Sequence, residues 1–459
     1  MMSLRDASAA IGAKALGSDV RFFTVSTDSR TLSRGALFVA LRGERFDGHR
    51  FLDAAREGGA AAALVDAESK STAASARLPL LVVGDTRLGL ARLAAHWRAR
   101  FDIPLVAVTG SNGKTTVKEM IAAILRAHFG ETLVLATEGN LNNDIGLPLT
   151  LLKLREDHRV AVVELGMNHP GETASLAAIA SPTVALVNNA QREHQEFMKN
   201  VAEVAREHAS VFGALRPGGV AVINADDEFA DYWRGILAGR HLRDFGIDRP
   251  AQVSARHEPA TFGSRIRLSA PEGEAAVDLH ASGRHNVLNA CAAAASALAA
   301  GASLGAVARG LGAFRPVGGR MQRLAASSGA RLIDDSYNAN PDSVRAAIDV
   351  LAAEPGTKLL LLGDMGEVGE RGVAFHQEVG RYARERGVDH LYALGDLSMA
   401  AAEAFGKGAR HFATVEEMIA AARKEVVSNT TALVKGSRFM RMERVVQALA
   451  AEPPQAGVH

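Results

Sequence analysis

A run from Pro104 to Phe129 constrains the fold of this chain more than any other feature. It reads as an apolar strand, Leu105 to Val108, then a turn, Thr109 to Thr116, and then a helix. In the turn, TGSNGKTT, the glycines let backbone N–H groups meet a phosphate without a Cβ in the way, and the lysine supplies a point charge. The apolar residues of the helix form one stripe, which anchors it with its N-terminus toward an anion. The run therefore predicts a phosphate loop in an α/β domain.

The loop departs from the common pattern G-x-x-x-x-G-K-[ST], because Val108 stands where that pattern has its first glycine. A bare Gly-Lys-Thr often only starts a helix, but the preceding strand and the periodic helix favour the phosphate loop. We expect Thr115 to place its hydroxyl on Mg²⁺ and Lys114 to act on the outer phosphates of ATP. The expected nucleotide-binding residues are Gly110, Ser111, Asn112, Gly113, Lys114, Thr115 and Thr116.

Length and composition limit the classes of protein to consider. At 459 residues the chain is too long for one core, so we expect about three domains. Its 52 basic and 51 acidic residues give a net charge of +1, which argues against nucleic acid as a partner. The single cysteine, Cys291, excludes an internal disulfide, and its Ala-rich surroundings predict a buried core position.

The apolar segments are short. No apolar run approaches about 18 residues, and nothing resembles a signal peptide. We therefore expect a soluble cytoplasmic protein without membrane insertion, and a monomer is the default expectation.

Strand and helix patterns divide the chain into three expected domains, all of the α/β class. Residues 1–102 alternate short strands with helices, and Pro104 marks the next boundary. Residues 103–313 carry the phosphate loop and a mostly parallel sheet. We expect the strand GGVAVINADD to close the parallel set, and an antiparallel subsheet to follow from about Arg240 to Ala281. Beyond the hinge-like LGAFRPVGGRMQ, residues 314–459 predict a doubly wound sheet.

Polar residues follow several of the expected strands. Glu164 ends the strand RVAVVE beside the phosphate loop, where a Mg²⁺ ligand belongs. His194 follows another strand, on a loop where we expect it to be an ordinary exposed residue. In the third domain the strands end at Asp335 and at Lys435 to Arg438, which predicts a ligand-binding edge there.

Two further polar clusters each admit two interpretations. Asn286 and Asn289 begin an Ala-rich helix, where they hold a purine or simply cap the helix. Near the N-terminus, the turns around Thr27 to Arg30 and Arg42 to His49 are either solvated loops or a second anion site.

The sequence resembles the Mur ligase family over nearly its whole length. It is similar to the branch that adds D-alanyl-D-alanine to a UDP-linked muramoyl tripeptide, and it lacks the Asn-Pro-Arg motif expected of a sister ligase that adds a diamino acid. The motifs that carry the resemblance are TDSR, GALFVALRGERFDGH, TGSNGKTT, GNLNNDIGLPLTLL, VVELGMN, GRHNVLNA, DDSYNANPDS, LLGDMGEVG and LVKGSRFMRME.

This resemblance implies an ATP-dependent amide ligase of peptidoglycan precursor synthesis. Its substrates would be UDP-N-acetylmuramoyl-tripeptide and D-alanyl-D-alanine, its cofactors ATP and Mg²⁺, and its intermediate an acyl phosphate. The small N-terminal domain would hold the UDP-sugar, the central phosphate-loop domain would be the ATPase, and the C-terminal domain would be Rossmann-like and complete the ATP site.

The same resemblance implies roles for residues in each domain. Lys114, Glu164, Asn338 and Lys435 would be catalytic, and Thr115 and Glu164 would hold the metal. Asn286, Asn289, Arg320 and Asp335 would bind ATP. The substrate-binding residues would be Ser29, Arg30, Asp47, His49, Asn340 and Arg438.

The chain departs from the family at one position. Where the family typically has a lysine, modified to a carbamate that bridges metals, this chain has AREH, Ala205 to His208. We therefore expect the second metal to be managed without a carbamate, and Arg206 to contact phosphate or substrate. Two alternatives stay open: a related amide ligase such as a folylpolyglutamate synthetase, and a non-catalytic nucleotide-binding protein.

Overall fold

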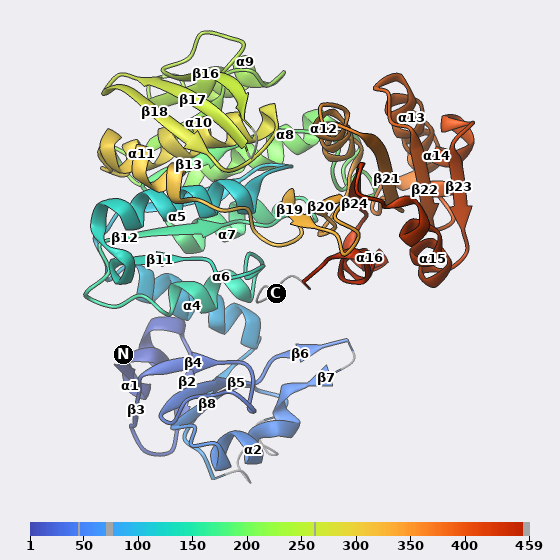
Figure 1. Ribbon diagram of the computed structural model, residues 1–459. Coiled ribbons are helices and arrows are strands. Elements are labelled where there is room, and N and C mark those ends of the chain that lie inside the picture. Colours follow the sequence, from blue (N-terminus) through green and yellow to red (C-terminus); the bar gives the residue numbers. More distant parts are fainter. Residues whose placement is uncertain (45, 70–76, 261–262, 453–459) are drawn as a thin grey trace.

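Three sheet-containing units follow one another along the chain. The computed structural model describes residues 1–44, 46–69, 77–260 and 263–452. The N-terminal unit lies below the central unit in Figure 1, and the C-terminal unit lies beside the central one. Within these described ranges, no helix is both long and apolar enough to cross a membrane. The predicted α/β class, with three such units, is confirmed.

The N-terminal unit is built on a five-stranded sheet of order β2-β9-β8-β5-β4. Strands β5 and β8 are buried throughout, because helices cover both faces of the sheet. The elements are β1 Met2–Ser3, α1 Leu4–Ile11, β2 Lys14–Leu16, β3 Arg21–Phe22, β4 Thr24–Ser26, β5 Ala36–Val39, β6 Arg42–Gly43, β7 Phe46–Asp47, η1 Gly48–Phe51, α2 Leu52–Glu57, β8 Ala62–Asp66, β9 Leu80–Val83 and α4 Thr86–Arg98.

The central unit is a nine-stranded sheet of order β11-β12-β10-β13-β14-β15-β16-β17-β18. Its strands are β10 Leu105–Thr109, β11 Val134–Ala136, β12 Val160–Glu164, β13 Val184–Val187, β14 Val220–Asn224, β15 His241–Gly246, β16 Val253–Ala260, β17 Gly263–Ala270 and β18 Gly273–Leu279. The expectation that β14 closes the parallel set is wrong, because β15 and the start of β16 continue it. The antiparallel strands β16 to β18 then extend the same sheet.

Helices cover both faces of the central sheet. The phosphate-loop helix α5 packs with α10 and α11, and Cys291 of α10 is fully buried, as predicted. The helices and 3₁₀ turns are α5 Lys114–Phe129, η2 Glu131–Leu133, α6 Gly146–Leu151, α7 Glu172–Ala180, α8 Val201–Ala209, η3 Ser210–Ala214, α9 Ala230–Ile236, α10 Arg284–Ala299 and α11 Leu304–Ala313.

The N-terminal and central units share one hydrophobic core. Leu37 of β5 and Leu105 of β10 belong to the same buried cluster. Helix α4 joins the two units, since it packs against α1 on one side and against α6 and α7 on the other. At the boundary predicted at Pro104 the chain therefore passes from one sheet to the next, while the same hydrophobic core continues across it.

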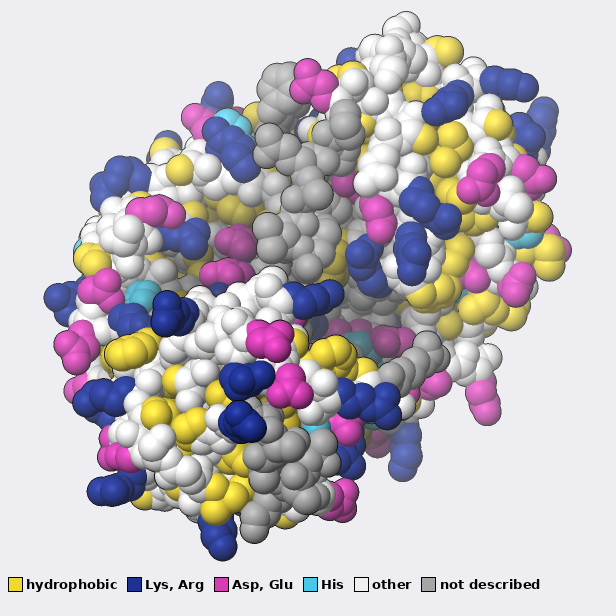
Figure 2. Space-filling view, turned by 90° about the horizontal axis from the view of Figure 1, so that it is seen from below, with side chains coloured by type: hydrophobic (Ala, Val, Ile, Leu, Met, Phe, Trp, Pro, Cys, Tyr) yellow, Lys and Arg dark blue, Asp and Glu magenta, His cyan; other side chains and the backbone are white. Residues whose placement is uncertain are grey.

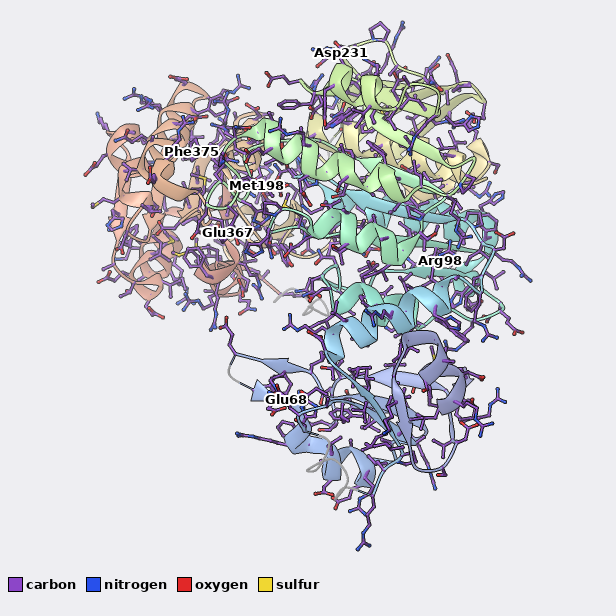
Figure 3. The ribbon with its side chains drawn as sticks, turned by 180° about the vertical axis from the view of Figure 1, so that it is seen from behind. Glu68, Arg98, Met198, Asp231, Glu367 and Phe375 are labelled. Carbon is purple, nitrogen blue, oxygen red and sulfur yellow. The ribbon has the colours of Figure 1, made fainter. Side chains whose placement is uncertain are left out.

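Arg98, at the end of α4, fixes this junction (Figure 3). Its side chain is fully buried, and its guanidinium donates to the carbonyl oxygens of Phe101, Ile103, Ala180 and Ser181 at 2.6 to 3.4 Å. Burial lowers the pKa of Arg98 to about 10, which still leaves the group charged at neutral pH. The linker and the end of α7 are thus tied to α4 through one side chain.

The C-terminal unit is a doubly wound sheet of order β19-β20-β24-β21-β22-β23, parallel except for β19. Helices α12 to α14 pack on one face, and α15 and α16 pack on the other. The elements are β19 Gln322–Ala325, β20 Arg331–Asp335, α12 Pro341–Ala352, β21 Thr357–Gly363, η4 Gly369–Arg371, α13 Gly372–Glu385, β22 His390–Leu394, α14 Ser398–Phe405, β23 Ala409–Phe412, α15 Val415–Glu425, β24 Thr430–Lys435, η5 Arg438–Met440 and α16 Glu443–Leu449.

Replacing Arg98 tests how much this junction contributes to stability. We expect Arg98→Met to lower the free energy of unfolding by about 3 kcal/mol or more, because several buried carbonyls lose their donor at about 1–3 kcal/mol each. Urea unfolding followed by circular dichroism measures the change. The matched control is Arg92→Met on the same helix, where the exposed Arg92 makes one contact of 3.5 Å, to the Ile11 carbonyl. Equal losses in the two variants would contradict the assigned role.

Candidate active site

A cavity of about 1640 Å³ lies between the central and C-terminal units. The phosphate loop forms one wall, and the carboxyl ends of β20 and β24 contribute to the other. On the face shown in Figure 2, Lys and Arg side chains are interspersed with Asp and Glu, so any strong preference for an anion comes from local geometry. The predicted site residues that line the cavity are Ser111, Asn112, Gly113, Lys114, Thr115, Thr116, Glu164, Asn286, Asn289, Arg320, Asp335, Asn338, Asn340, Lys435 and Arg438.

The shape of the phosphate loop requires its two glycines. Gly110 and Gly113 have φ angles of +131° and +82°, which side chains rarely adopt. A Cβ at Gly110 would lie 3.0 Å from the backbone nitrogens of Asn188 and Asn189, and a Cβ at Gly113 would lie 2.6 Å from Asn289 Oδ1. The loop is therefore packed against neighbouring asparagines, and Gly110 lies behind the cavity wall.

Asparagines that follow β13 or belong to α10 hold the loop by hydrogen bonds. Asn189 Oδ1 accepts from the Asn112 backbone N–H at 2.8 Å, and the Asn188 side chain donates to the Asn112 carbonyl at 2.8 Å. Asn188 also donates to Asn289 Oδ1 at 3.1 Å, and Asn286 accepts from the Asn289 amide. Asn289 thus supports the loop from below as well as lining the cavity. Asn188 and Asn189 were absent from the predicted site, although their position after a buried strand is a usable signal.

Lys114 is folded back into the loop. Its Nζ donates to the carbonyl oxygens of Gly110 at 2.5 Å and Ser111 at 3.2 Å, and it lies 3.3 Å from Glu193 Oε2. Burial raises the pKa of Glu193, but the charge of Lys114 and the hydrogen bond from His208 lower it to about 2. Glu193 is therefore ionised at neutral pH, and it was not predicted to be part of the site.

Glu164 and Thr115 have the features that a divalent cation requires. Glu164 is 2% exposed, and its Oε1 accepts from Asn142 at 2.8 Å. Its other oxygen, Oε2, is buried and has no hydrogen-bond partner, so it is available to a cation. Thr115 is buried at the start of α5 and lines the same cavity. Among the described residues, no group of three or more His, Cys, Asp and Glu side chains forms a complete metal site.

Asp335 and Lys435 lie opposite each other in the sheet of the C-terminal unit. They are paired residues of β20 and β24, and Lys435 Nζ lies 2.5 Å from Asp335 Oδ2. Lys435 also donates to the Asn338 carbonyl at 2.9 Å and is 3% exposed. The guanidinium of Arg320 lies 4.1 Å from the centre of the Tyr337 ring. The predicted ligand-binding edge thus presents one buried, ion-paired lysine to the cavity.

The two walls touch through the phosphate loop and through the loop that follows β13. Asn340, which caps α12, exchanges hydrogen bonds with Asn112 at 2.9 and 3.3 Å. Arg192 binds Asp342 of α12 and Glu378 of α13, with closest distances of 2.5 and 2.7 Å. Its guanidinium also lies 5.3 Å from the Phe375 ring centre. The phosphate loop is therefore connected directly to the C-terminal unit.

The N-terminal residues predicted to bind substrate lie outside this cavity. Arg30 is exposed and pairs with Asp28 at 2.7 Å in the turn after β4, and Ser29 lies in the same turn. His49 is 4% exposed; its Nδ1 lies 2.6 Å from Asp47, and its Nε2 accepts from the Asp66 backbone N–H. Both ring nitrogens of His49 are thus engaged within the unit, and its predicted role in substrate binding stays a prediction.

Two expectations about the loop and helix after β13 are wrong. Arg206 is exposed on α8 and does not line the cavity, because His208, two residues later, is the side chain of α8 that faces the loop. His194 is not an exposed surface residue, since its side chain is 13% exposed, lines the cavity and lies 2.6 Å from Glu367. Figure 3 labels Met198 and Glu367 at this junction of the two units.

Comparison with known proteins places the sequence and the fold in one family. Family models match three segments: the Mur ligase family catalytic domain at residues 22–98, the Mur ligase middle domain at 108–297, and the Mur ligase glutamate ligase domain at 319–438. The chain belongs to the Mur ligase family.

Individual relatives share nearly the whole chain. UDP-N-acetylmuramoyl-tripeptide--D-alanyl-D-alanine ligase of Escherichia coli (strain K12) is 42% identical over 94% of this chain and 95% of its own. Among solved structures, MurF from Acinetobacter baumannii is 34% identical with a TM-score of 0.88, over 96% of this chain and 97% of its own. MurF ligase from Thermotoga maritima, solved in complex with ADP, is 26% identical with a TM-score of 0.81, over 93% of this chain and 96% of its own. A relative with this fold therefore holds an adenine nucleotide.

Replacing Arg192 tests the contact between the two walls. We expect Arg192→Met to shift the molecule toward an open arrangement, because Asp342 and Glu378 lose their ion pairs with the central unit, at about 1.5–3 kcal/mol for a charged hydrogen bond. Small-angle X-ray scattering measures the increase in the radius of gyration. The control is Arg345→Met, which removes another partner of Glu378 within the C-terminal unit. A radius unchanged in both variants would contradict the assignment.

The same contact predicts a dependence on pH. Hydrogen bonding and charge from Arg192 hold the pKa of Glu378 below its ordinary value of 4.5, with a smaller effect from Arg345. A lowered pKa means that the contact is at full strength above pH 4.5 and is lost as the pH falls through the lowered value. Scattering should therefore show opening on acidification in the wild type, and less change in Arg192→Met. Far-UV circular dichroism checks that the units remain folded.

Proposed function

We propose that this Mur ligase adds D-alanyl-D-alanine to UDP-N-acetylmuramoyl-tripeptide in peptidoglycan precursor synthesis, acting as a cytoplasmic monomer. The observation that carries the proposal is the single cavity in which the phosphate loop and Glu164 face Asp335, Asn338 and Lys435 of the C-terminal unit. The close relatives that carry this activity in their names support the choice of substrates.

The reaction explains why cations must line the cavity. Joining a carboxylate to an amine is uphill in water, so the tripeptide carboxylate first attacks the γ-phosphate of ATP and releases ADP. The amine of D-alanyl-D-alanine then attacks the acyl phosphate, an amide bond forms and phosphate leaves. In the first step the attacking carboxylate and the γ-phosphate are both anionic, and at about 4 Å with an effective dielectric near 20 each pair of charges repels by roughly 4 kcal/mol.

Lys114 and Lys435 each place a permanent positive charge on one of the two walls, beside the arginines that also line the cavity. Lys114 now donates to loop carbonyls, and in the complex it would turn to the outer phosphates. Lys435 is oriented by Asp335 and by the Asn338 carbonyl, which leaves its charge directed at the cavity from the opposite side. Asn338 and Asn340 would orient phosphate or the reacting carboxylate, and Arg320 would contact ATP from the hinge.

Mg²⁺ fits the residues on the phosphate-loop wall. Thr115 and the unpartnered Oε2 of Glu164 are the oxygen ligands that would hold it. When bound, Mg²⁺ neutralises phosphate charge and so lowers the repulsion between the reactants. Asn142 orients Glu164 by donating to its other oxygen.

The remaining predicted residues divide between the two substrates. Asn286 and Asn289 would lie at the adenine, where α10 begins. Ser29 and Arg30 would meet the uridine nucleotide on the exposed turn of the N-terminal unit, with Asp47 and His49 shaping the neighbouring loop. Arg438, exposed at the cavity edge and paired with Glu443, would bind substrate. As domains, we propose 1–102, 103–313 and 314–459.

The two alternative functions are not favoured. The function of a folylpolyglutamate synthetase would not account for the N-terminal unit, whose residues 22–98 match the Mur ligase family catalytic domain. A non-catalytic nucleotide-binding protein gives no reason for keeping Lys114, Thr115 and the unpartnered Glu164 together in one cavity.

A product assay tests the proposal. We expect phosphate release from ATP only when UDP-N-acetylmuramoyl-tripeptide and D-alanyl-D-alanine are both present, with the pentapeptide detected by mass spectrometry. Lys114→Met should lower kcat by about 10²-fold or more, the range found when one charge-stabilising donor is removed. Activity with glutamate and a pterin would reject the proposal, and so would the absence of turnover with every substrate pair.

A further inference from the structure

A chain of four side chains runs beneath the phosphate loop, and nucleotide recognition alone does not explain it. Thr109 Oγ1 lies 2.9 Å from His208 Nδ1, and His208 Nε2 lies 2.7 Å from Glu193 Oε1. The other carboxylate oxygen of Glu193 lies 3.3 Å from Lys114 Nζ. Thr109 and His208 are fully buried and Glu193 is 7% exposed. Lys114 and Glu193 line the cavity, whereas Thr109 and His208 lie behind its wall.

The buried chain holds one negative charge at a fixed place. A neutral His208 satisfies both of its contacts by donating from Nε2 to Glu193 and accepting at Nδ1 from the Thr109 hydroxyl. Lys114 is the permanent cation at Glu193, and His194, at 3.7 Å, adds charge only when it is protonated. His208 and Thr109 are buried, so they keep the Glu193 carboxylate in place even when Lys114 moves away from it.

Binding of a nucleotide changes the charges around Glu193. Lys114 Nζ is now used by the Gly110 and Ser111 carbonyls and by Glu193, so it must turn away from them to reach the phosphates. Glu193 then loses its permanent cation, while more negative charge enters the cavity beside it. A buried carboxylate without a cation strongly opposes a neighbouring anion, because the low dielectric does little to screen the repulsion.

We infer that Glu193, held by His208 and Thr109, is a positioning residue that makes nucleotide binding depend on a divalent cation. Without the cation, Glu193 keeps Lys114 inside the loop and opposes the phosphates. With the cation on the same wall, its charge is compensated and Lys114 is released to the nucleotide. The inference rests on the proposed function only in taking an adenine nucleotide as the ligand.

Calorimetric titration with ADP tests the coupling in the full-length protein. The affinity is measured in excess MgCl₂ and in EDTA, for the wild type and for Glu193→Gln. We expect removal of Mg²⁺ to weaken ADP binding about tenfold less in Glu193→Gln than in the wild type, mainly because the variant binds metal-free ADP more tightly. The matched control is Glu228→Gln, which removes an exposed carboxylate from the same cavity. In this control, the ratio of the ADP affinity in MgCl₂ to that in EDTA should equal the wild-type ratio. An equal ratio in the wild type and in Glu193→Gln would overturn the inference.

A second measurement needs no nucleotide. In Lys114→Met, Glu193 lacks its permanent cation in the empty site, so this variant should bind Mn²⁺ alone more tightly than the wild type, as followed by electron paramagnetic resonance. Adding Glu193→Gln should abolish the gain, and a gain that persists in the double variant would overturn the inference. Thermal unfolding checks that each variant is folded. A wild type that binds ADP but fails the product assay counts against the proposed function alone.

Discussion

The site depends on one constraint: a loop that must receive a highly charged anion is itself built from uncharged amides. Gly110 and Gly113 permit its backbone path, and the side chains of Asn188 and Asn289, together with the backbone of Asn189, fill the space that glycine leaves. Amides can both donate and accept, so they satisfy the loop backbone without adding charge. The charged groups, Lys114, Glu164 and Glu193, can therefore be placed separately around a loop that already has its shape.

Connection between the units follows from the same loop. The segment after β13 supplies Asn188 and Asn189 to the phosphate loop and, three residues later, Arg192 to the C-terminal unit. Asn112 of the loop also meets Asn340 directly. The position of the C-terminal wall, which carries Lys435, is thus set by the chain segment that shapes the nucleotide site. A reaction that needs charges on both walls benefits because this short segment fixes the position of one wall relative to the other.

The sequence predicted those parts of the fold that depend on local pattern. The strand, glycine turn and periodic helix around Lys114 identified the phosphate loop, and strand ends pointed to Glu164, Asp335 and Lys435. The contribution of Glu193 and His208 was not predictable, because it depends on how α8 packs under β10, far away in sequence. Arg206 was chosen from the motif alone, and helical geometry turned it to solvent. The continuation of the sheet through β15 was missed since its residues are only partly buried.

The shared core around Arg98 has a consequence for how the molecule melts. Because one buried cluster spans the N-terminal and central sheets, unfolding either one exposes apolar surface of the other. The C-terminal unit keeps its own two clusters and is joined mainly through polar contacts. Calorimetry should therefore resolve two cooperative transitions, one for the first two units together and one for the last, although the three largest sheets of the described residues each look like a separate domain.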